Sequence, residues 1–241
     1  MSELIVETRD LSMRFGGVLA VNSVNFSVRE RELRCLIGPN GAGKSTLFKC
    51  LTGQHRVTHA NGRIFIRGHD VTGWRPHEIV RLGVGIKTQV PSVMNGLTVW
   101  ENLWLAARRI HGRDGTRSEV ENVVQDLGIG SILRRQVGEL AHGQRQIVEL
   151  GLVLIQRPNL VLLDEPAAGI TGAESERLIE LIKNINKIAA VVVVDHDMNF
   201  VRMLGGWITV LHQGAVLTEG ATDDVLTNAR VREVYLGTRA R

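Results

Sequence analysis

Aromatic residues and cysteines are scarce in this sequence, and neither type is arranged as a binding site. Phe, Trp and Tyr make up only 4 % of the 241 residues, whereas the 44 % hydrophobic and 22 % charged residues are an ordinary globular balance. The two cysteines, Cys35 and Cys50, lie in an apolar strand pattern and a helix pattern, without CxxC or metal-ligand spacing. We therefore expect both to be reduced core residues of a cytosolic protein.

A membrane-spanning segment and a signal-peptide pattern are also missing. The longest apolar run, residues 188–194, is far below the ~20 residues that a helix needs to cross a bilayer. The first residues carry Glu3 and Glu7 and lack a basic region followed by an apolar stretch. Any membrane role is therefore expected to depend on a partner.

Basic residues are in slight excess but form no patch. The formal net charge is +4, yet the closest basic neighbours are pairs such as Arg108-Arg109 and Arg134-Arg135. Without a longer Lys/Arg run, a solvated surface explains this charge better than a nucleic-acid interface. We expect no nucleic-acid partner.

Hydrophobic patterning indicates an α/β chain. The predicted strands are residues 4–8, 24–28, 33–37, 62–68, 160–163 and 189–194, and the predicted helices are 44–51, 76–82, 147–155 and 173–186. Residues 97–133 are expected to be mainly helical, with a polar break at 112–115. The apolar strands at 160–163 and 189–194 are typical of a parallel sheet that is covered on both faces.

A phosphate-binding loop joins the strand at 33–37 to the helix at 44–51. Its sequence matches G-x-x-x-x-G-K-[ST] and is Gly38-Pro39-Asn40-Gly41-Ala42-Gly43-Lys44-Ser45, continued by Thr46. Glycines allow backbone N–H groups to converge on phosphate oxygens at a helix N-terminus. Lys44 is expected to bridge the β- and γ-phosphates, and Ser45 to hold Mg²⁺ through its hydroxyl. Since a chance match is expected on the order of 1 % of the time, the loop predicts ATP binding.

Two carboxylates follow the apolar strand at 160–163. Asp164 and Glu165 stand at its carboxyl end, which is where open α/β sheets bind ligands. Asp164 is placed to reach Mg²⁺ through water, and Glu165 to accept a proton from the attacking water. Next to a phosphate loop, this pair predicts ATP hydrolysis.

With these two motifs, the sequence resembles the ATPase subunits of ABC transporters over nearly its whole length. Three further residues match positions of that family. The resemblance implies that Gln89 senses Mg²⁺ and the membrane partner, that His196 contacts the γ-phosphate, and that Phe15 stacks on adenine. Phe15 could equally be a core residue at a strand end. Residues 169–171 lie where the family contacts the opposing subunit.

The family's signature motif, Leu-Ser-Gly-Gly-Gln, corresponds here to Leu140-Ala141-His142-Gly143-Gln144. In the family this motif faces the ATP bound by the other subunit, so the resemblance implies a composite site. Ala141 lacks the serine hydroxyl, which predicts a weaker or differently tuned site. Gly143 and the helix N-terminus can still offer N–H groups to an anion. His142 is expected to be a tolerated loop residue rather than a catalytic group.

The resemblance implies one ABC ATPase domain over residues 1–241. The expected fold is α/β: a P-loop NTPase (RecA-like) core with an N-terminal antiparallel β subdomain and a helical insertion. Residues 1–88 would form the β subdomain and the P-loop part of the core. Residues 89–155 would form the Q-loop and the helical subdomain with the signature, and 156–241 the rest of the core.

Local features narrow the resemblance to importers of branched-chain amino acids and urea. Residues 14–17, 140–144, 195–198 and 234–237 are similar to that branch, and the signature is most similar to urea-transport ATPases. The resemblance implies a second ATPase subunit, two permeases and, indirectly, an exported solute-binding protein. The expected location is the cytoplasmic face of a bacterial-type inner membrane. The signature differs from the family's usual form at Ala141 and His142, and this difference favours a heterodimer over a homodimer.

The predicted function is therefore an ATPase that energises import of a small polar solute, with urea as the first candidate. Branched-chain amino acid import is the alternative. Coupling to the permease is expected through residues 89–105, where Trp100 and Trp104 lie one helical turn apart and are expected to be core. A soluble ABC ATPase acting on nucleic acid or ribosomes is less favoured, because residues 90–139 lack sustained heptads and the chain has one cassette.

Overall fold

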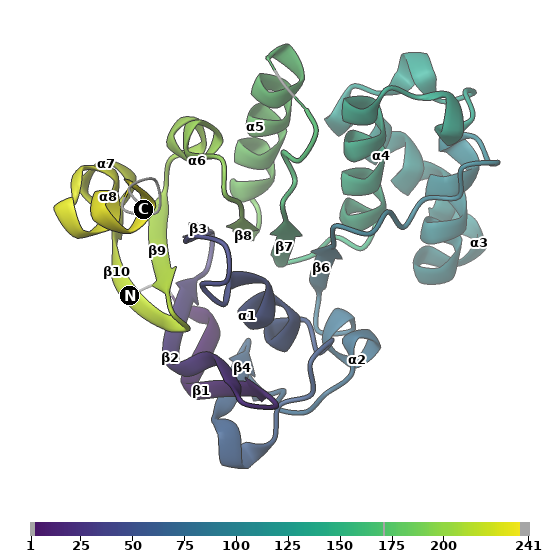
Figure 1. Ribbon diagram of the computed structural model, residues 1–241. Helices are drawn as coiled ribbons and strands as arrows, with labels where there is room; N and C mark the ends of the chain where they lie inside the picture. The colour runs from purple at the N-terminus through teal and green to yellow at the C-terminus, as the bar shows by residue number, and fades with distance from the viewer. Residues whose placement is uncertain (1–2, 171, 237–241) are drawn as a thin grey trace.

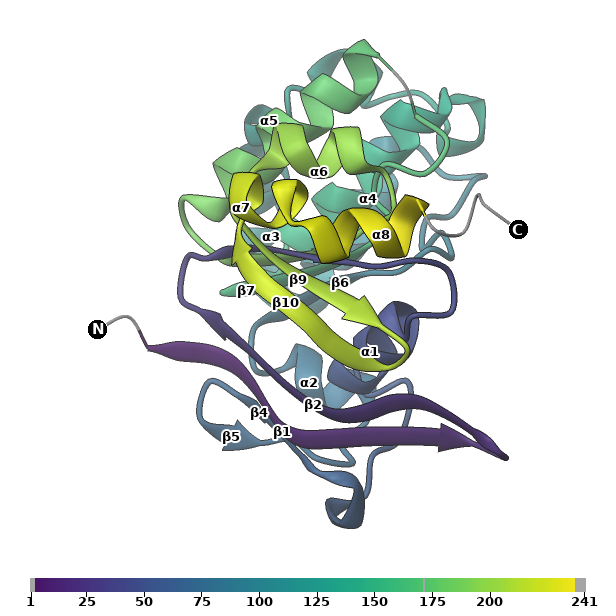
Figure 2. The same cartoon turned by 60° about the vertical axis from the view of Figure 1, so that its left-hand side comes forward.

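The computed structural model describes residues 3–170 and 172–236. A four-stranded antiparallel sheet, ordered β2-β1-β4-β5, forms the lower part of the molecule in Figure 2. Its strands are β1 (Leu4–Phe15), β2 (Val18–Arg29), β4 (Arg63–Ile66) and β5 (His69–Asp70). This sheet confirms the expected antiparallel β subdomain.

The first two strands are longer than the sequence predicts. Residues 4–8 and 24–28 are only parts of β1 and β2, which pair from Leu4–Arg29 to Phe15–Val18. Their outer halves carry exposed polar residues, and the ladder contains register shifts. An apolar-run criterion misses such segments because backbone hydrogen bonds, rather than burial of both faces, hold them.

A six-stranded sheet forms the core, in the order β10-β9-β3-β8-β7-β6. Its parallel strands are β3 (Leu33–Ile37), β6 (Val84–Lys87), β7 (Leu160–Asp164), β8 (Ala190–Val194) and β9 (Trp207–His212). The edge strand β10 (Ala215–Ala221) pairs with β9 in the antiparallel sense. The parallel arrangement confirms the interpretation of the continuous apolar strands.

Alternate residues of the parallel strands enter two separate hydrophobic clusters. Leu162 and Val192 pack with α1 (Lys44–Leu51) and the antiparallel sheet, whereas Val161 and Val193 pack with the helices on the other side. Those helices are α5 (Ala173–Asn186), α6 (Met198–Leu204), α7 (Thr222–Thr227) and α8 (Ala229–Leu236), which lie above the sheet in Figure 2. The sheet is therefore covered on both faces.

The middle of the chain is helical, and it stands to one side of the core in Figure 1. It contains α3 (Val99–Leu127), two short 3-10 turns and α4 (His142–Leu154). The predicted break in α3 occurs at Gly112, whose φ of 68° and ψ of −161° are not helical. α4 begins five residues before the predicted 147, because the Gln144 side chain accepts a hydrogen bond from the Ala141 N–H at its start. The predicted subdomain boundaries at 88/89 and 155/156 stay predictions.

Candidate nucleotide-binding and hydrolysis site

The P-loop lies between β3 and α1, as its sequence predicts. Gly38, Gly41 and Gly43 have φ values of 153°, 79° and 102°, which a side chain would strain. A Cβ on Gly38 would also overlap the Leu211 carbonyl, and one on Gly43 the Ala20 carbonyl. The loop backbone therefore curls tightly between two strands before α1 begins, which leaves the first N–H groups of α1 available to an anion.

Lys44 is held inside this loop. Its side chain is 7 % exposed, and Nζ donates hydrogen bonds to the carbonyl oxygens of Gly38 (2.6 Å) and Pro39 (3.0 Å). Burial lowers the pKa of Lys44, while the negative charges of Glu165, Asp164 and Asp195 raise it. The ammonium group thus faces the carboxylates at the ends of β7 and β8.

Asp164 ends β7 and is 4 % exposed. Burial and then the charge of Glu165 raise its pKa to about 6, whereas Lys49 and Lys87 lower it. Its Oδ1 atom is buried, and no hydrogen bond reaches it from the part of the chain that the structure describes. A buried carboxylate oxygen without a donor is well suited to a cation or its water ligand, so this position fits Mg²⁺.

Glu165 adopts a backbone conformation that is unusual for its residue type. Its φ is 45°, and its N–H donates to the Val194 carbonyl oxygen (2.8 Å), which fixes the turn at the end of β7. Glu165 Oε1 lies 3.6 Å from His196 Nδ1. The side chain of Glu165 is 25 % exposed and that of His196 is 58 % exposed, so both remain accessible to a ligand.

Asp195 is a residue of this site that sequence reasoning missed. It is 1 % exposed, and its Oδ1 accepts hydrogen bonds from the N–H groups of His196 (2.7 Å) and Asp197 (3.0 Å). Burial raises its pKa, and these hydrogen bonds oppose the rise. Asp195 therefore shapes the loop that presents His196. An acid directly after the apolar strand at 189–194 was the available signal.

Phe15 is exposed rather than part of the core. Its exposed fraction is 45 %, and its ring meets the His55 ring edge-on at 5.0 Å, with an interplanar angle of 63°. The alternative of a core residue at the strand end is therefore wrong. β1 extends to Phe15, which pairs with Val18 at the exposed end of the β1–β2 hairpin. An exposed ring can stack on a flat ligand. Gln89, two residues beyond β6, is also exposed.

The signature residues surround the start of α4. Ala141 is the N-cap and offers no side-chain cap. His142 is the first residue of the helix rather than a free loop residue, and its Nε2–H donates to the Ala168 carbonyl oxygen (2.9 Å). The Glu174 carboxylate lies against Gly143, with its oxygens 2.5 and 2.8 Å from where a Cβ would stand. Thr171, the last residue of the expected 169–171 contact, lies outside the described residues.

Within the described ranges, no hydrogen bond or ion pair joins residues 140–144 to the P-loop. The structure thus gathers the P-loop, Asp164, Glu165 and His196 in one place and leaves the signature separate. Tyr235 on α8 is a further neighbour of the P-loop that sequence reasoning did not assign to the site. Burial raises its pKa to about 12, and a hydrogen bond with the Gly38 backbone lowers it.

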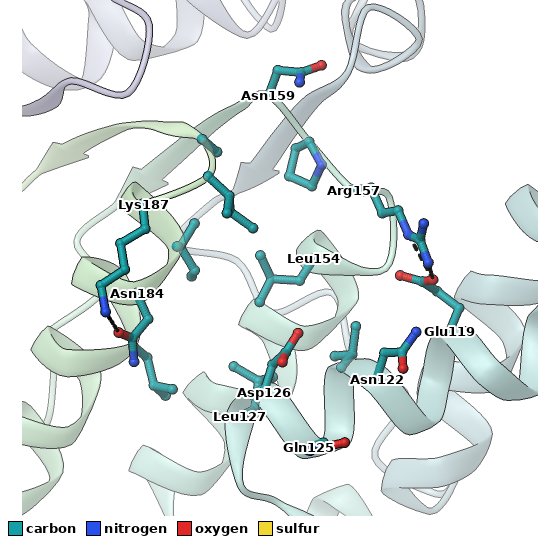
Figure 3. A pocket seen from close by; sticks show the side chains of 16 residues that line it. Glu119, Asn122, Gln125, Asp126, Leu127, Leu154, Arg157, Asn159, Asn184 and Lys187 are labelled. Carbon is teal, nitrogen blue, oxygen red and sulfur yellow. Dashed lines mark hydrogen bonds and ion pairs between the residues drawn. The ribbon is translucent and has the colours of Figure 1, made fainter.

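A cavity of about 770 Å³ lies elsewhere, between α3, α5 and the segment before β7. Figure 3 shows the Arg157–Glu119 ion pair on one wall and the Lys187–Asn184 hydrogen bond (2.8 Å) on another. In the described parts of the chain, no cluster of three or more His, Cys, Asp or Glu residues could hold a metal, and no helix has the length and apolar character to cross a bilayer.

The family model described as "ABC transporter" matches residues 21–168. The chain belongs to the ABC transporter family. This ABC chain is 36 % identical to BraF of Pseudomonas aeruginosa, a high-affinity branched-chain amino acid transport ATP-binding protein, over 98 % of this chain and 99 % of that protein. It is 32 % identical to LivG of Escherichia coli, which carries the same description, over 98 % and 99 %.

Solved ABC structures share the fold. The ADP conformation of MJ1267, an ATP-binding cassette of an ABC transporter, matches with a TM-score of 0.86 and 25 % identity, over 98 % of this chain and 100 % of that one. The expected fold class is therefore confirmed, and the chain is an ABC-type ATPase that uses ATP.

Proposed function

We propose that this chain is the ATPase subunit of an ABC importer for branched-chain amino acids. The observation that carries the proposal is its relationship to BraF and LivG over essentially the full length of both chains. This relationship favours the alternative that the sequence left open over urea, which the signature motif had suggested. A signature of five residues is a weaker guide to the branch of the family than similarity over 98 % of the chain.

The proposed ATP site consists of the P-loop residues together with Phe15. Backbone N–H groups of residues 38–46 surround the phosphates, and Lys44 exchanges its hydrogen bonds to Gly38 and Pro39 for phosphate oxygens. Phe15 supports the adenine. The short distance from Lys44 to these carbonyls supports this exchange, since the ammonium already lies within the loop.

Mg²⁺ is proposed to lie at Ser45, Asp164 and Gln89. Asp164 Oδ1 is buried and accepts no hydrogen bond from the described residues, which supports this position. Mg²⁺ is ordinarily held by one or two carboxylates together with phosphate oxygens. When bound, the ion neutralises charge that develops on the phosphates. Asp164 would hold the ion through a water molecule, and Ser45 would hold it through its hydroxyl.

Glu165 is proposed to accept the proton of the attacking water, and His196 to contact the γ-phosphate. The 3.6 Å separation of His196 Nδ1 and Glu165 Oε1 supports a shared water between phosphate and carboxylate. The turn at Glu165, tied to Val194, holds the carboxylate still during proton transfer. A neutral Gln at this position would keep the shape and lose the base.

The composite site is proposed to form with a second ATPase subunit, in a heterodimer or a homodimer. The signature residues 140–144 stand apart from this chain's own P-loop, which supports their use at a partner's ATP. Gly143 is buried at the start of α4, where backbone N–H groups point outward. The regular signature of a second subunit would complete this chain's site.

Two permeases are proposed to dock on the surface around the Q-loop, at the cytoplasmic face of the membrane. Large apolar side chains are exposed there: Val90 (75 %), Met94 (57 %), Leu105 (43 %) and Trp104 (38 %). Val90 and Met94 lie in the loop before α3, and Trp104 and Leu105 lie within its first two turns, so the exposed apolar side chains belong to one short segment. A contiguous exposed apolar patch is typical of an interaction site. Trp100 packs against the core as expected, whereas Trp104 is partly exposed and belongs to this surface.

The test is a pull-down from native membranes in mild detergent, with Glu165→Gln and ATP as bait. Recovery of two permeases and a second ATPase is the expected result, and the wild-type chain with ADP is the control. The solute-binding protein encoded with these partners should then bind leucine, isoleucine or valine. Binding of urea alone would contradict the proposed solute, and recovery of ribosomes or DNA-repair proteins without permeases would contradict transport.

A further inference from the structure

A buried ion pair connects the core sheet to the signature helix. Lys87 is the last residue of β6, and Glu149 lies in α4. Lys87 Nζ and Glu149 Oε2 are 3.2 Å apart, and the two side chains are 6 % and 4 % exposed. Two residues after Lys87 comes Gln89, so the pair joins the strand that leads into the Q-loop to the helix that begins with the signature.

The surroundings of this pair are closely packed and apolar. β6 and α4 approach each other at Gly85, where a Cβ would overlap Val153 and lie 3.1 Å from the Pro158 ring. On the other side of α4, a Cβ on Gly151 would lie 3.1 Å from Leu103 and Leu127 of α3. Apolar contacts of this kind hold two elements together but do not fix the angle between them, because they are not directional. An ion pair in a dry interface is directional and can fix that angle.

Stability alone does not account for such a pair. Desolvation of two charges offsets most of their attraction, and well-packed hydrophobic residues often replace a buried pair without loss of stability. Removing one partner, by contrast, leaves an unpaired buried charge, which destabilises strongly. A role in geometry therefore explains the pair better than a role in stability.

A small tilt of α4 at Glu149 would move the signature residues at the start of the helix. Glu149 lies seven residues after His142, which places the start of α4 ~10 Å away along the helix axis at 1.5 Å per residue. If α4 tilts about Glu149 by ~10°, the start of the helix moves by ~2 Å. Misplacement of a catalytic group by ~1 Å can cost about a hundredfold in rate.

We propose that Lys87 and Glu149 are positioning residues that fix the angle of the signature helix relative to the Q-loop and the P-loop core. The inference rests on the proposed role of residues 140–144 at a partner's ATP. Through this pair, a displacement of the Q-loop by a permease passes to α4 and moves the signature toward or away from the opposing nucleotide.

The experiment compares Lys87→Met, Glu149→Met and the double variant. Each single variant leaves a buried charge unpaired and should lower the melting temperature, while the double variant should melt close to wild type. All measurements are made at pH 8.5, because Lys87→Met also removes a charge that lowers the pKa of Asp164, and at this pH Asp164 stays ionised without it. ATP affinity of the isolated double variant should then stay within about threefold of wild type, because the P-loop is untouched. In the complex purified from membranes, its kcat should fall at least about tenfold with little change in KM.

A control is the ion pair between Arg157 and Glu119, in which the Glu119 side chain is also buried, at 6 % exposure, while Arg157 is 66 % exposed. Its double replacement by Met should leave kcat unchanged, since it joins α3 to the segment after α4 and does not tie α4 to β6. A Lys87→Met/Glu149→Met variant that folds and turns over ATP at the wild-type rate would overturn the inference.

Ala141→Asp separates this inference from the proposed function. Ala141 is the exposed N-cap of α4, a position where Asp is favoured, so the fold should be kept. An added carboxylate at the start of α4 should repel a phosphate and abolish turnover if the signature acts there. Loss of turnover in Ala141→Asp, with normal turnover in the double variant, would overturn only the role of the ion pair. Normal turnover in Ala141→Asp would overturn the proposed role of the signature and the inference together.

Discussion

Asp164→Asn should make the folded chain more stable while removing a group that hydrolysis requires. The ordinary pKa of Asp164 is 3.8, and burial raises it to about 6 in the folded chain. Because the folded-state pKa is the higher one, the ionised carboxylate destabilises the native state. The pKa difference corresponds to roughly 3 kcal/mol at high pH. Because Asn, like the protonated acid, is a neutral buried polar group, the expected gain at high pH is nearly all of this difference, roughly 3 kcal/mol.

The pH dependence of this gain follows from the sign of the shift. Well below pH 4 Asp164 is protonated in both the folded and the unfolded chain, so the substitution changes little. Between about pH 4 and 6 the folded chain binds the extra proton, and the cost of ionisation grows. Above about pH 6 the cost is complete. At pH 5 the gain should be about half its value at pH 8.

Urea unfolding in EDTA at pH 8 and pH 5 measures this difference directly. Asp126→Asn, on the exposed surface of α3, is the matched control and should change the free energy of unfolding very little. An Asp164→Asn chain that is no more stable than wild type at pH 8, or whose gain is as large at pH 5, would refute the reasoning. With Mg²⁺ and ATP the order should reverse, because the wild type alone gains the full binding energy at the proposed metal site.

Three other substitutions or reagents test separate parts of the structure. Phe15→Ala should raise the KM for ATP about tenfold through the loss of stacking, while Phe15→Trp keeps it near wild type in a steady-state assay. Gly85→Ala should lower the free energy of unfolding by about 1–3 kcal/mol because its methyl group overlaps Val153, whereas Gly130→Ala, which has open space, should not. Cys35 and Cys50, whose pKa values burial raises to about 12, should resist iodoacetamide at pH 8 in the folded chain and react in urea.

The sequence predicts those parts of the fold in which local signals agree. The strand at 33–37, the helix at 44–51 and the helix at 173–186 match the structure residue for residue. The strand is apolar except for Arg34, and the two helices follow glycines and have amphipathic patterns. The P-loop and the acids after β7 follow from their position at strand ends, which the parallel sheet then brings together.

Other elements could not be predicted from local patterns. β6 is only four residues long and contains Gly85, and the hairpin of β9 and β10 ends in partly exposed residues. The Lys87–Glu149 pair could not be predicted because its two charges are far apart in sequence and lie in otherwise apolar patterns. Such contacts arise from tertiary packing, so no propensity at either position indicates them.

Glu165 is the residue on which the account of ATP hydrolysis depends most directly. The decisive measurement is ATP turnover by Glu165→Gln in the membrane complex, together with the nucleotide that co-purifies with it. Loss of the base should reduce kcat at least about a hundredfold while ATP remains bound between the subunits. Turnover near the wild-type rate, or ADP in place of trapped ATP, would contradict the assignment of Glu165 as the base.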